Sequence, residues 1–414
     1  MSTPSGPAAG SGGWAPRPGY QRGGLPASGA PAGRAGAPAT SAHGAASPAP
    51  GWAAPLTRHR RRGDVAKYVI AVVGGLGLLI MLGLIAMNAG GSSHVILPVA
   101  LAMIPLVIVL AAVFWIDRWE PEPFGVLLAA FLWGAGVATV ISLVVNTTAS
   151  VLVASSTGDP SGGELVSAVV SAPLIEESTK GLGVLIIYLI WRRTFNGPVD
   201  GIVYAAVVAG GFAFAENVLY FVQYSDSLMQ TFLMRAVFSP FAHVTFTACT
   251  GLAIGVSSRM RSRLAWLWMT PIGLVAAMML HAFWNGVISV APGLYLLVEV
   301  PFFLACVALV IWLRWSERMT MRQRLMDYAR AGWFDPAEIT MLTTGSGRSA
   351  ARRWARGRGP VAAQAMKEFQ TSTAALAQLR QQGLDGHAEA DYATTERELL
   401  DSVAASRRVF LARG

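Results

Sequence analysis

The chain has 414 residues, of which 53% are hydrophobic and only 13% charged, and its mean hydropathy is +0.48. This composition excludes an ordinary soluble globule and indicates a polytopic membrane protein. The net charge of +9 lies mostly in tails and loops, so it indicates membrane topology and attraction to lipid rather than nucleic-acid binding. The two cysteines both lie in apolar segments, which excludes a disulfide framework or a cysteine-based zinc site.

The first part of the chain has the composition of a disordered segment. Residues 1–64 are rich in glycine, proline, alanine and serine, so we expect them to bury no core. We see no apolar core of a cleavable signal peptide among them. A basic run at 58–62 stands directly before the first apolar segment and predicts a cytoplasmic flank. The segment is therefore expected to be disordered and cytoplasmic.

Eight apolar segments follow, each long enough to cross the hydrocarbon core of a bilayer. We expect them at about 67–87, 95–116, 124–153, 165–191, 199–222, 229–257, 264–290 and 293–314. Basic residues follow the even-numbered segments and are absent from the other connections, although Arg235 lies just inside the sixth segment. Because basic residues stay on the cytoplasmic side, both termini are predicted to be cytoplasmic. The expected fold is all-α, with a transmembrane domain of about eight helices over 65–315.

The remaining residues, 316–414, predict a helical cytoplasmic tail. Asp335 is followed by a proline and then by Glu338, the pattern of a helix start with a capping box. A basic, glycine-containing stretch near 346–360 is expected to be a linker close to the anionic leaflet. Two further helices are expected at about 361–381 and 387–410. The tail shows no catalytic chemistry, so we expect it to serve packing or regulation.

Three ionisable residues interrupt the fourth apolar segment. Glu176, Glu177 and Lys180 lie within one helical turn, and each charge near the centre of a bilayer helix costs at least ~2.5 to 3.5 kcal/mol. Lys180 is four residues from the first glutamate and three from the second, so it can neutralise one carboxylate while the other points elsewhere. The spacing does not say which. Either a structural ion pair or an intramembrane catalytic centre would explain the group.

More polar residues occur in the next three segments. The fifth carries Glu216 and Asn217, the sixth carries His243, and the seventh carries His281 and Asn285. Taken alone, a histidine inside a membrane segment can be a hydrogen-bonded packing residue, and a glutamate with an asparagine can cap a kink.

The predicted depths of these residues favour a shared site. At 1.5 Å per residue from each cytoplasmic end, the two adjacent glutamates lie about 21 Å deep, Glu216 and His281 about 25 Å, and His243 about 21 Å. Four consecutive helices that alternate in direction therefore place their polar groups in one layer. Scattered packing residues would not be expected to share a depth, so convergence on one site is the stronger hypothesis.

Carboxylates and imidazoles in one layer suit hydrolysis of a peptide bond. Glu216, His243 and His281 could hold a zinc ion through oxygen and nitrogen atoms and leave a position open for water. One of Glu176 and Glu177 would then be the general base that activates this water, while the metal polarises the scissile carbonyl.

Two further residues complete this catalytic hypothesis. Asn285 lies one helical turn from His281, where its amide could stabilise an oxyanion, and Lys180 balances the charge of one glutamate. The same residues could also act without a metal, with a glutamate activating water directly and histidine and asparagine donors stabilising the oxyanion. The sequence alone does not separate the two mechanisms.

On these motifs the chain resembles the PrsW family of intramembrane proteases, distant relatives of the CAAX prenyl endopeptidases and bacteriocin-processing homologues. The resemblance covers about residues 65–315. Its motifs are Glu176-Glu177-x-x-Lys180, Phe212-x-x-x-Glu216-Asn217, His243, His281-x-x-x-Asn285 and the cytoplasmic Asp117-Arg118-x-Glu120-Pro121-Glu122-Pro123. The wider superfamily usually has histidine at the position where this chain has Glu216.

The resemblance implies an integral protease of a bacterial plasma membrane that cuts a membrane-anchored protein or peptide. PrsW-type proteases act on a membrane-anchored anti-sigma factor and make the first cut on its outer side, which agrees with the predicted depth. The partners expected are the substrate and the bilayer, with no nucleic acid. The oligomeric state is left open.

Two other classes of function are compatible with buried polar residues. A proton-coupled transporter or ion pathway also uses intramembrane Glu and His, and flux dependent on Glu216 would favour it. However, the two halves of the chain show no convincing repeat, and the polar residues cluster in four of the eight segments. A catalytically silent scaffold is disfavoured because buried charges are costly to keep without a function.

Overall fold

The computed structural model describes residues 61–119, 121–192, 194–388 and 390–412, and these residues form helices and no strand. The expected disordered segment, 1–64, falls almost wholly outside them. The helices of the N-terminal part are α1 (Arg61–Asn88), α2 (Ile96–Ile116), α3 (Phe124–Leu132), α4 (Thr139–Thr157), α5 (Pro160–Val166), α6 (Ala172–Ile190), α7 (Pro198–Gln223), α8 (Leu228–Phe232), α9 (Ala242–Ser258), α10 (Trp266–Val290) and α11 (Tyr295–Arg330).

Three π-helical turns join or extend these helices. The turns are η3 (Trp133–Ala138) between α3 and α4, η4 (Ser167–Ser171) between α5 and α6, and η6 (Leu233–Phe238) after α8. A π-helical turn inserts an extra residue into the helix and redirects the side chains around it, and such turns are frequent at functional sites.

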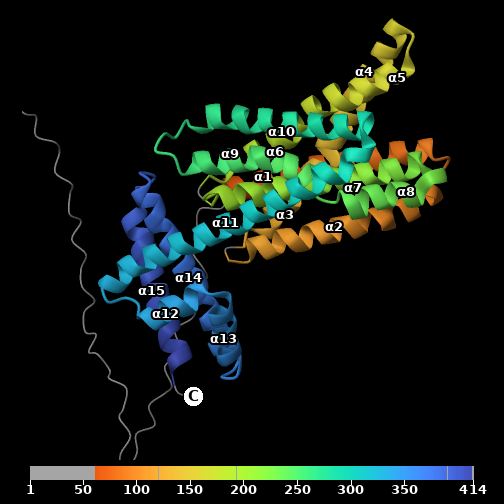
Figure 1. The fold of residues 1–414 in the computed structure, drawn as a ribbon. Helices are drawn as coiled ribbons and strands as arrows, with labels where there is room; N and C mark the ends of the chain where they lie inside the picture. The colour runs from red at the N-terminus through yellow and green to blue at the C-terminus, as the bar shows by residue number, and fades with distance from the viewer. Residues whose placement is uncertain (1–60, 120, 193, 389, 413–414) are drawn as a thin grey trace, which may run out of the picture.

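Seven helices of the described region are long and apolar enough to cross a membrane. They coincide with seven of the eight predicted segments, which confirms an all-α, integral membrane protein. The eighth, predicted at 165–191, is also helical through η4 and α6, but its three ionisable residues make it too polar to count by composition. Figure 1 shows these helices running alongside one another in a single bundle.

α7 is the central helix of the bundle, because it packs against α2, α3, α6 and α9 and is largely buried. Glycines allow its neighbours to come close. A Cβ atom on Gly201 would collide with the carbonyl oxygen of Gly251 on α9, and one on Gly211 with that of Phe131 on α3. Such contact between small residues is how helices pack tightly in a bilayer. It fixes α7, and so Glu216, against the elements around it.

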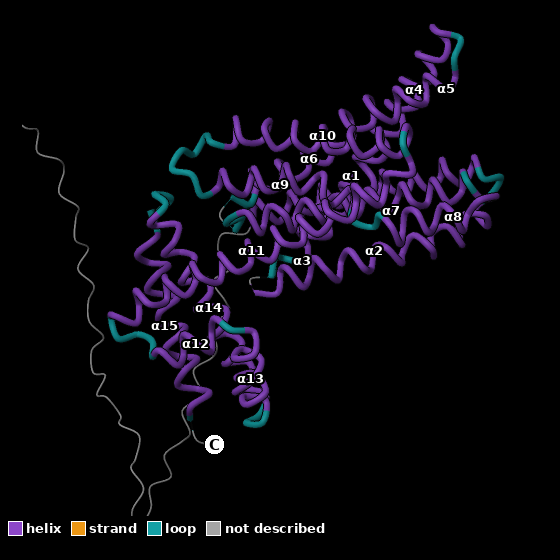
Figure 2. The backbone as a smooth tube through the Cα atoms, viewed as in Figure 1, coloured by secondary structure: helices purple, strands orange, loops and turns teal. Residues whose placement is uncertain are grey.

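The tail contains α12 (Pro336–Thr343), α13 (Gly345–Arg356), α14 (Pro360–Leu384) and α15 (Tyr392–Leu411). The predicted capping box is present, with Asp335 and Glu338 each bonded to the other's backbone N–H. The two last helices lie where they were expected and pack against each other. α11 continues to Arg330, well beyond the predicted end near 314, and carries the chain out of the bundle (Figure 2).

The stretch near 346–360 is not the linker that the sequence led us to expect. Most of it forms α13, which begins where the Thr344 hydroxyl accepts a hydrogen bond from the Gly347 N–H. Arg348 and Ala355 are buried on one face of this helix, against the core of the tail. This burial outweighs the low helix propensity of the glycines at either end.

Buried hydrogen bonds join the connection between α2 and α3 to α7, at the end of the bundle where the tail begins. The Asp117 carboxylate accepts a hydrogen bond from the Glu122 N–H (2.9 Å), and the Tyr204 hydroxyl donates to Glu122 (2.6 Å). Burial raises the pKa of Asp117 to about 6. Tyr204 lies about 18 Å along α7 from Glu216, so this motif acts as a brace far from the polar layer.

Candidate active site

The polar residues of α6, α7, α9 and α10 meet in one buried cluster. Its members are Glu176, Glu177, Lys180, Glu216, His243 and His281, which are joined by hydrogen bonds or ion pairs. The convergence that the depth estimate predicted is therefore present in the structure. Asn285 lies apart from this network but lines the same cavity.

The carboxylate of Glu177 is held by three donor side chains. It is fully buried and accepts hydrogen bonds from Lys180 Nζ (2.7 Å), His281 Nδ1 (3.0 Å) and the Thr247 hydroxyl (2.9 Å). Since a carboxylate accepts, Nδ1 of His281 carries the proton and Nε2 keeps its lone pair. Glu177 thus orients an imidazole.

Glu176 has one oxygen left without a donor. Asn146 Nδ2 donates to its Oε1 (3.3 Å), and the orientation of that amide is fixed by the Ser171 hydroxyl (2.8 Å). Oε2 is buried and accepts no hydrogen bond from any described residue, although Lys180 Nζ lies 3.5 Å away. Because Glu176 lines the cavity and this oxygen has no donor, it can serve as an acceptor or ligand atom.

The position of Lys180 shows which of the two adjacent glutamates is its main partner. Its ammonium group is 0% exposed and lies nearer to Glu177 (2.7 Å) than to Glu176 (3.5 Å). It also donates to Nδ1 of His243 (3.2 Å) and sits 4.2 Å from the centre of the Phe212 ring. Glu177 is therefore its main partner.

His243 has a carboxylate of its own. Its Nε2 donates to Glu216 (2.8 Å), while Nδ1 keeps a lone pair and lies 4.0 Å from Oε2 of Glu176. Glu216 is held in turn by an ion pair with Arg235. The cluster thus contains two similar sets of residues. In each, a histidine is hydrogen-bonded to a carboxylate, and the carboxylate is paired with a cation.

Arg235, which the sequence offered only as an exception to the charge pattern, comes from the π-helical turn η6. Its Nε donates to Asn217 (2.7 Å), and its guanidinium lies 4.1 Å from the centre of the Tyr220 ring. Asn146 was also missed. The signals were present, because each is a strongly polar side chain inside an apolar segment, but only the fold reveals their partners.

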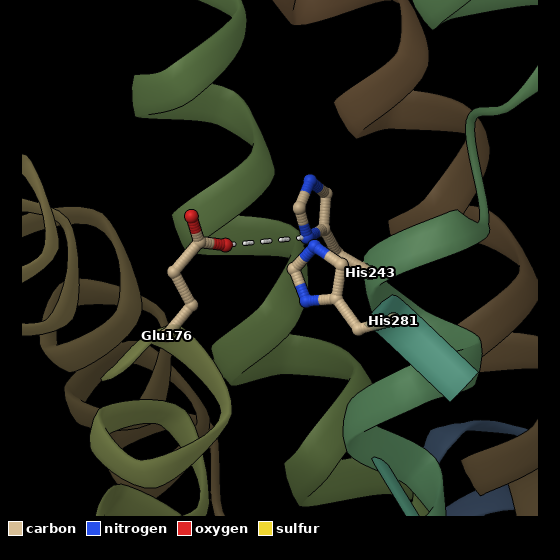
Figure 3. A group of neighbouring side chains, drawn as sticks. All are labelled: Glu176, His243 and His281. Atoms are coloured by element: carbon tan, nitrogen blue, oxygen red, sulfur yellow. Dashed lines mark ion pairs between the residues drawn. The ribbon is translucent and has the colours of Figure 1, made fainter. Parts of the chain in front are cut away.

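Among the described residues, Glu176, His243 and His281 form a group that could hold a metal ion. Each offers one ligand atom, and these atoms lie within 4.8 Å of one another. Figure 3 shows the carboxylate of Glu176 facing both imidazole rings. The expected set had Glu216 in place of Glu176. In the structure, Oε2 of Glu216 is paired with Arg235 and His243.

The donor set fits a divalent metal. Two imidazole nitrogens and a carboxylate oxygen are ligands typical of catalytic zinc. Both lone pairs belong to imidazoles whose other nitrogen is held by a carboxylate, the arrangement that orients metal-binding histidines. One competing contact exists, because Lys180 now donates to the Nδ1 atom of His243 that would bind the metal.

A cavity of about 950 Å³ lies against this cluster. It extends to Ser161 on α5 and to Ser227 in the connection before α8, at the end of the bundle away from the tail. Asn285, the predicted oxyanion donor, lines it, but one of its amide hydrogens is given to the carbonyl of Ala168 in η4 (2.8 Å). Its second amide hydrogen remains for other contacts.

Comparison with known proteins bears on what such a cavity does. Residues 122–312 match the family model described as "PrsW family intramembrane metalloprotease". Protease PrsW of Clostridioides difficile (strain 630) is 28% identical over 244 residues, which cover 56% of this chain and 93% of the relative. Protease PrsW of Bacillus subtilis (strain 168) is 27% identical over 175 residues, 42% of this chain and 74% of the relative. Over these residues the chain is similar to the PrsW family of intramembrane metalloproteases.

A third relative, Protease PrsW of Geobacillus kaustophilus (strain HTA426), is 29% identical over 165 residues, covering 40% of this chain and 68% of the relative. No solved structure matches the chain. The matched region, 122–312, contains the whole polar cluster, together with Asn146, Arg235 and Asn285. The protein is an integral membrane protease, and a transporter or scaffold is not favoured.

Proposed function

We propose that the chain is an intramembrane endopeptidase that hydrolyses a peptide bond in the cavity beside Glu176, His243 and His281. The observation that carries the proposal is the oxygen of Glu176 that has no donor, at the wall of the cavity, opposite two imidazoles that each keep a lone pair. Hydrolysis needs a group that activates water and a group that stabilises the developing oxyanion.

We assign the metal of this protease to zinc, held by Glu176, His243 and His281. Such an ion supplies Lewis-acid polarisation of the scissile carbonyl and acidifies bound water. The other residues hold the ligands: Glu177 fixes the ring of His281, and Glu216 fixes the ring of His243. A metal at this site would require Lys180 to give up its hydrogen bond to His243, while its shorter contact with Glu177 could remain.

Proton transfer is assigned to Glu216 in this mechanism. Its Oε2 is held by Arg235 and His243, whereas its Oε1 has no donor among the described residues and the side chain lines the cavity. Glu216 takes up the proton of the attacking water at Oε1 and passes it to the leaving amine. In the metal-free alternative, Oε2 of Glu176 takes this proton instead.

Metal analysis separates these assignments. On purified, detergent-solubilised protein we expect about one zinc per chain, lost in Glu176→Gln and His281→Ala but retained in Glu216→Gln, which lacks activity. Zinc lost in Glu216→Gln and retained in Glu176→Gln would contradict the proposed ligand set. An active, chelator-resistant enzyme without metal would transfer the catalytic role to Glu176 alone.

We further propose that the substrate is a membrane-anchored protein of the anti-sigma type in a bacterial plasma membrane, cut near the outer surface. The proposal is supported by the basic residues on alternate connections, which favour an orientation with both termini inside and the Ser161 end of the cavity outside. A membrane-impermeant thiol reagent should label Ser161→Cys, but not Ser262→Cys, in intact cells. The reverse pattern would overturn this orientation.

A further inference from the structure

The exposed face of α13 is basic, and the fold of the tail does not use it. Arg348 and Ala355 are buried, whereas Ser349, Arg353 and Arg356 are exposed on the rest of the helix. From 345 to 358 the sequence contains five arginines and no acidic residue. A helix of this kind has an unpartnered positive face.

Of the four exposed arginines, two have partners inside the tail and two do not. Arg352 donates to Gln370 (2.7 Å), and Arg358 donates to the carbonyl of Phe410 (3.2 Å). Arg353 and Arg356 form no ion pair or hydrogen bond with any described residue. Their charges are therefore available to a partner outside the chain.

Apolar side chains stand beside these charges. Trp354 is 44% exposed and Val361, just after the helix, is 59% exposed. The guanidinium of Arg358 lies 4.4 Å from the centre of the Trp354 ring. Tryptophan next to arginine is the combination found at the boundary between headgroups and acyl chains.

The attachment of the tail sets where this face lies. α11 leaves the bundle without a break, and Gln382 on α14 donates to Asn196 in the α6–α7 connection (2.7 Å). Figure 1 shows α13 running across the direction of α2 and α10, beside the end of the bundle at which α2 ends and the tail begins. A helix with this direction would run parallel to the surface of a membrane that the bundle crosses.

We propose that α13 is an interfacial helix that docks the tail on anionic lipid headgroups through Arg353, Arg356 and Trp354. The occupant follows from charge complementarity, because an arginine face with no paired carboxylate, lying along a bilayer, meets lipid phosphates. The proposal is independent of the proteolytic activity and of which side of the membrane holds the tail.

The test places a fluorescent label on this face. The full chain with Cys249→Ala, Cys306→Ala and Ser349→Cys is labelled and reconstituted in nanodiscs of phosphatidylcholine, or of an equal mixture with phosphatidylglycerol. Acrylamide quenching of the label is expected to fall at least ~threefold in the anionic discs and to recover at high salt. Equal quenching in both lipids overturns the proposal.

Matched charge changes identify the face responsible. Adding Arg353→Gln and Arg356→Gln should abolish the lipid dependence. Adding Arg397→Gln and Arg408→Gln, exposed arginines of α15, removes the same charge and should leave it intact. An equal loss in both pairs would mean that net charge alone matters and would overturn the role of α13. The lipid comparison itself keeps all the arginines of α13, so it does not depend on how the arginine variants fold.

Discussion

Replacing Glu176 with glutamine is expected to reduce cleavage by at least ~10³-fold while leaving the protein folded. Glutamine has the same shape and can still accept the hydrogen bond from Asn146 at its amide oxygen. It cannot supply the anionic oxygen that faces the cavity, whether this oxygen binds a metal or takes a proton. The measurement is the cleavage rate of a single-span membrane substrate that the wild-type enzyme cuts in the same liposomes.

Glu164→Gln is the matched control. Glu164 also lines the cavity, but it is exposed on α5, and its variant carries the same change of charge. We expect it to cleave at close to the wild-type rate. Cleavage by Glu176→Gln at the rate of this control would move the reaction centre away from α6.

The sequence predicted the helices well because a membrane segment is recognised from its own composition. It also predicted which residues meet, because helices of similar length that alternate in direction bring equal depths together. Neither argument depends on side-chain partners. This is why the positions of Glu216, His243 and His281 could be inferred before their contacts were known.

The roles within the cluster could not be predicted in the same way. The choice between Glu176 and Glu177 depends on Thr247 and His281, which approach Glu177 from α9 and α10, and on Asn146, which approaches Glu176 from α4. Such rotational relations between distant helices have no signal in the spacing of one helix.

The partner of Arg235 could not be predicted from the sequence either. Its place inside the sixth segment counted as a departure from the charge pattern, yet its guanidinium neutralises Glu216. A buried charge inside an apolar segment predicts a partner of opposite charge, but not which one. Arg235 and His243 both pair with Oε2 of Glu216, whereas Glu176 offers an oxygen close to one nitrogen of each imidazole.

Lys180→Met is expected to lower the free energy of unfolding by about 3 to 5 kcal/mol, because it leaves the carboxylate of Glu177 buried without its cation. The measurement is thermal unfolding in detergent, followed by a thiol-reactive dye that reports exposure of the partly buried Cys249 and Cys306. A variant as stable as the wild type would show that the ammonium is not needed to keep Glu177 charged.

The double variant Lys180→Met with Glu177→Gln separates charge from packing. The glutamine oxygen can still accept from Thr247 or His281, and no uncompensated charge is left on Glu177, so much of the lost stability should return. Recovery of stability without recovery of cleavage would indicate that the Lys180–Glu177 pair orients His281 as well as balancing charge. No recovery of stability would instead attribute the loss to the packing of the Lys180 side chain against Phe212.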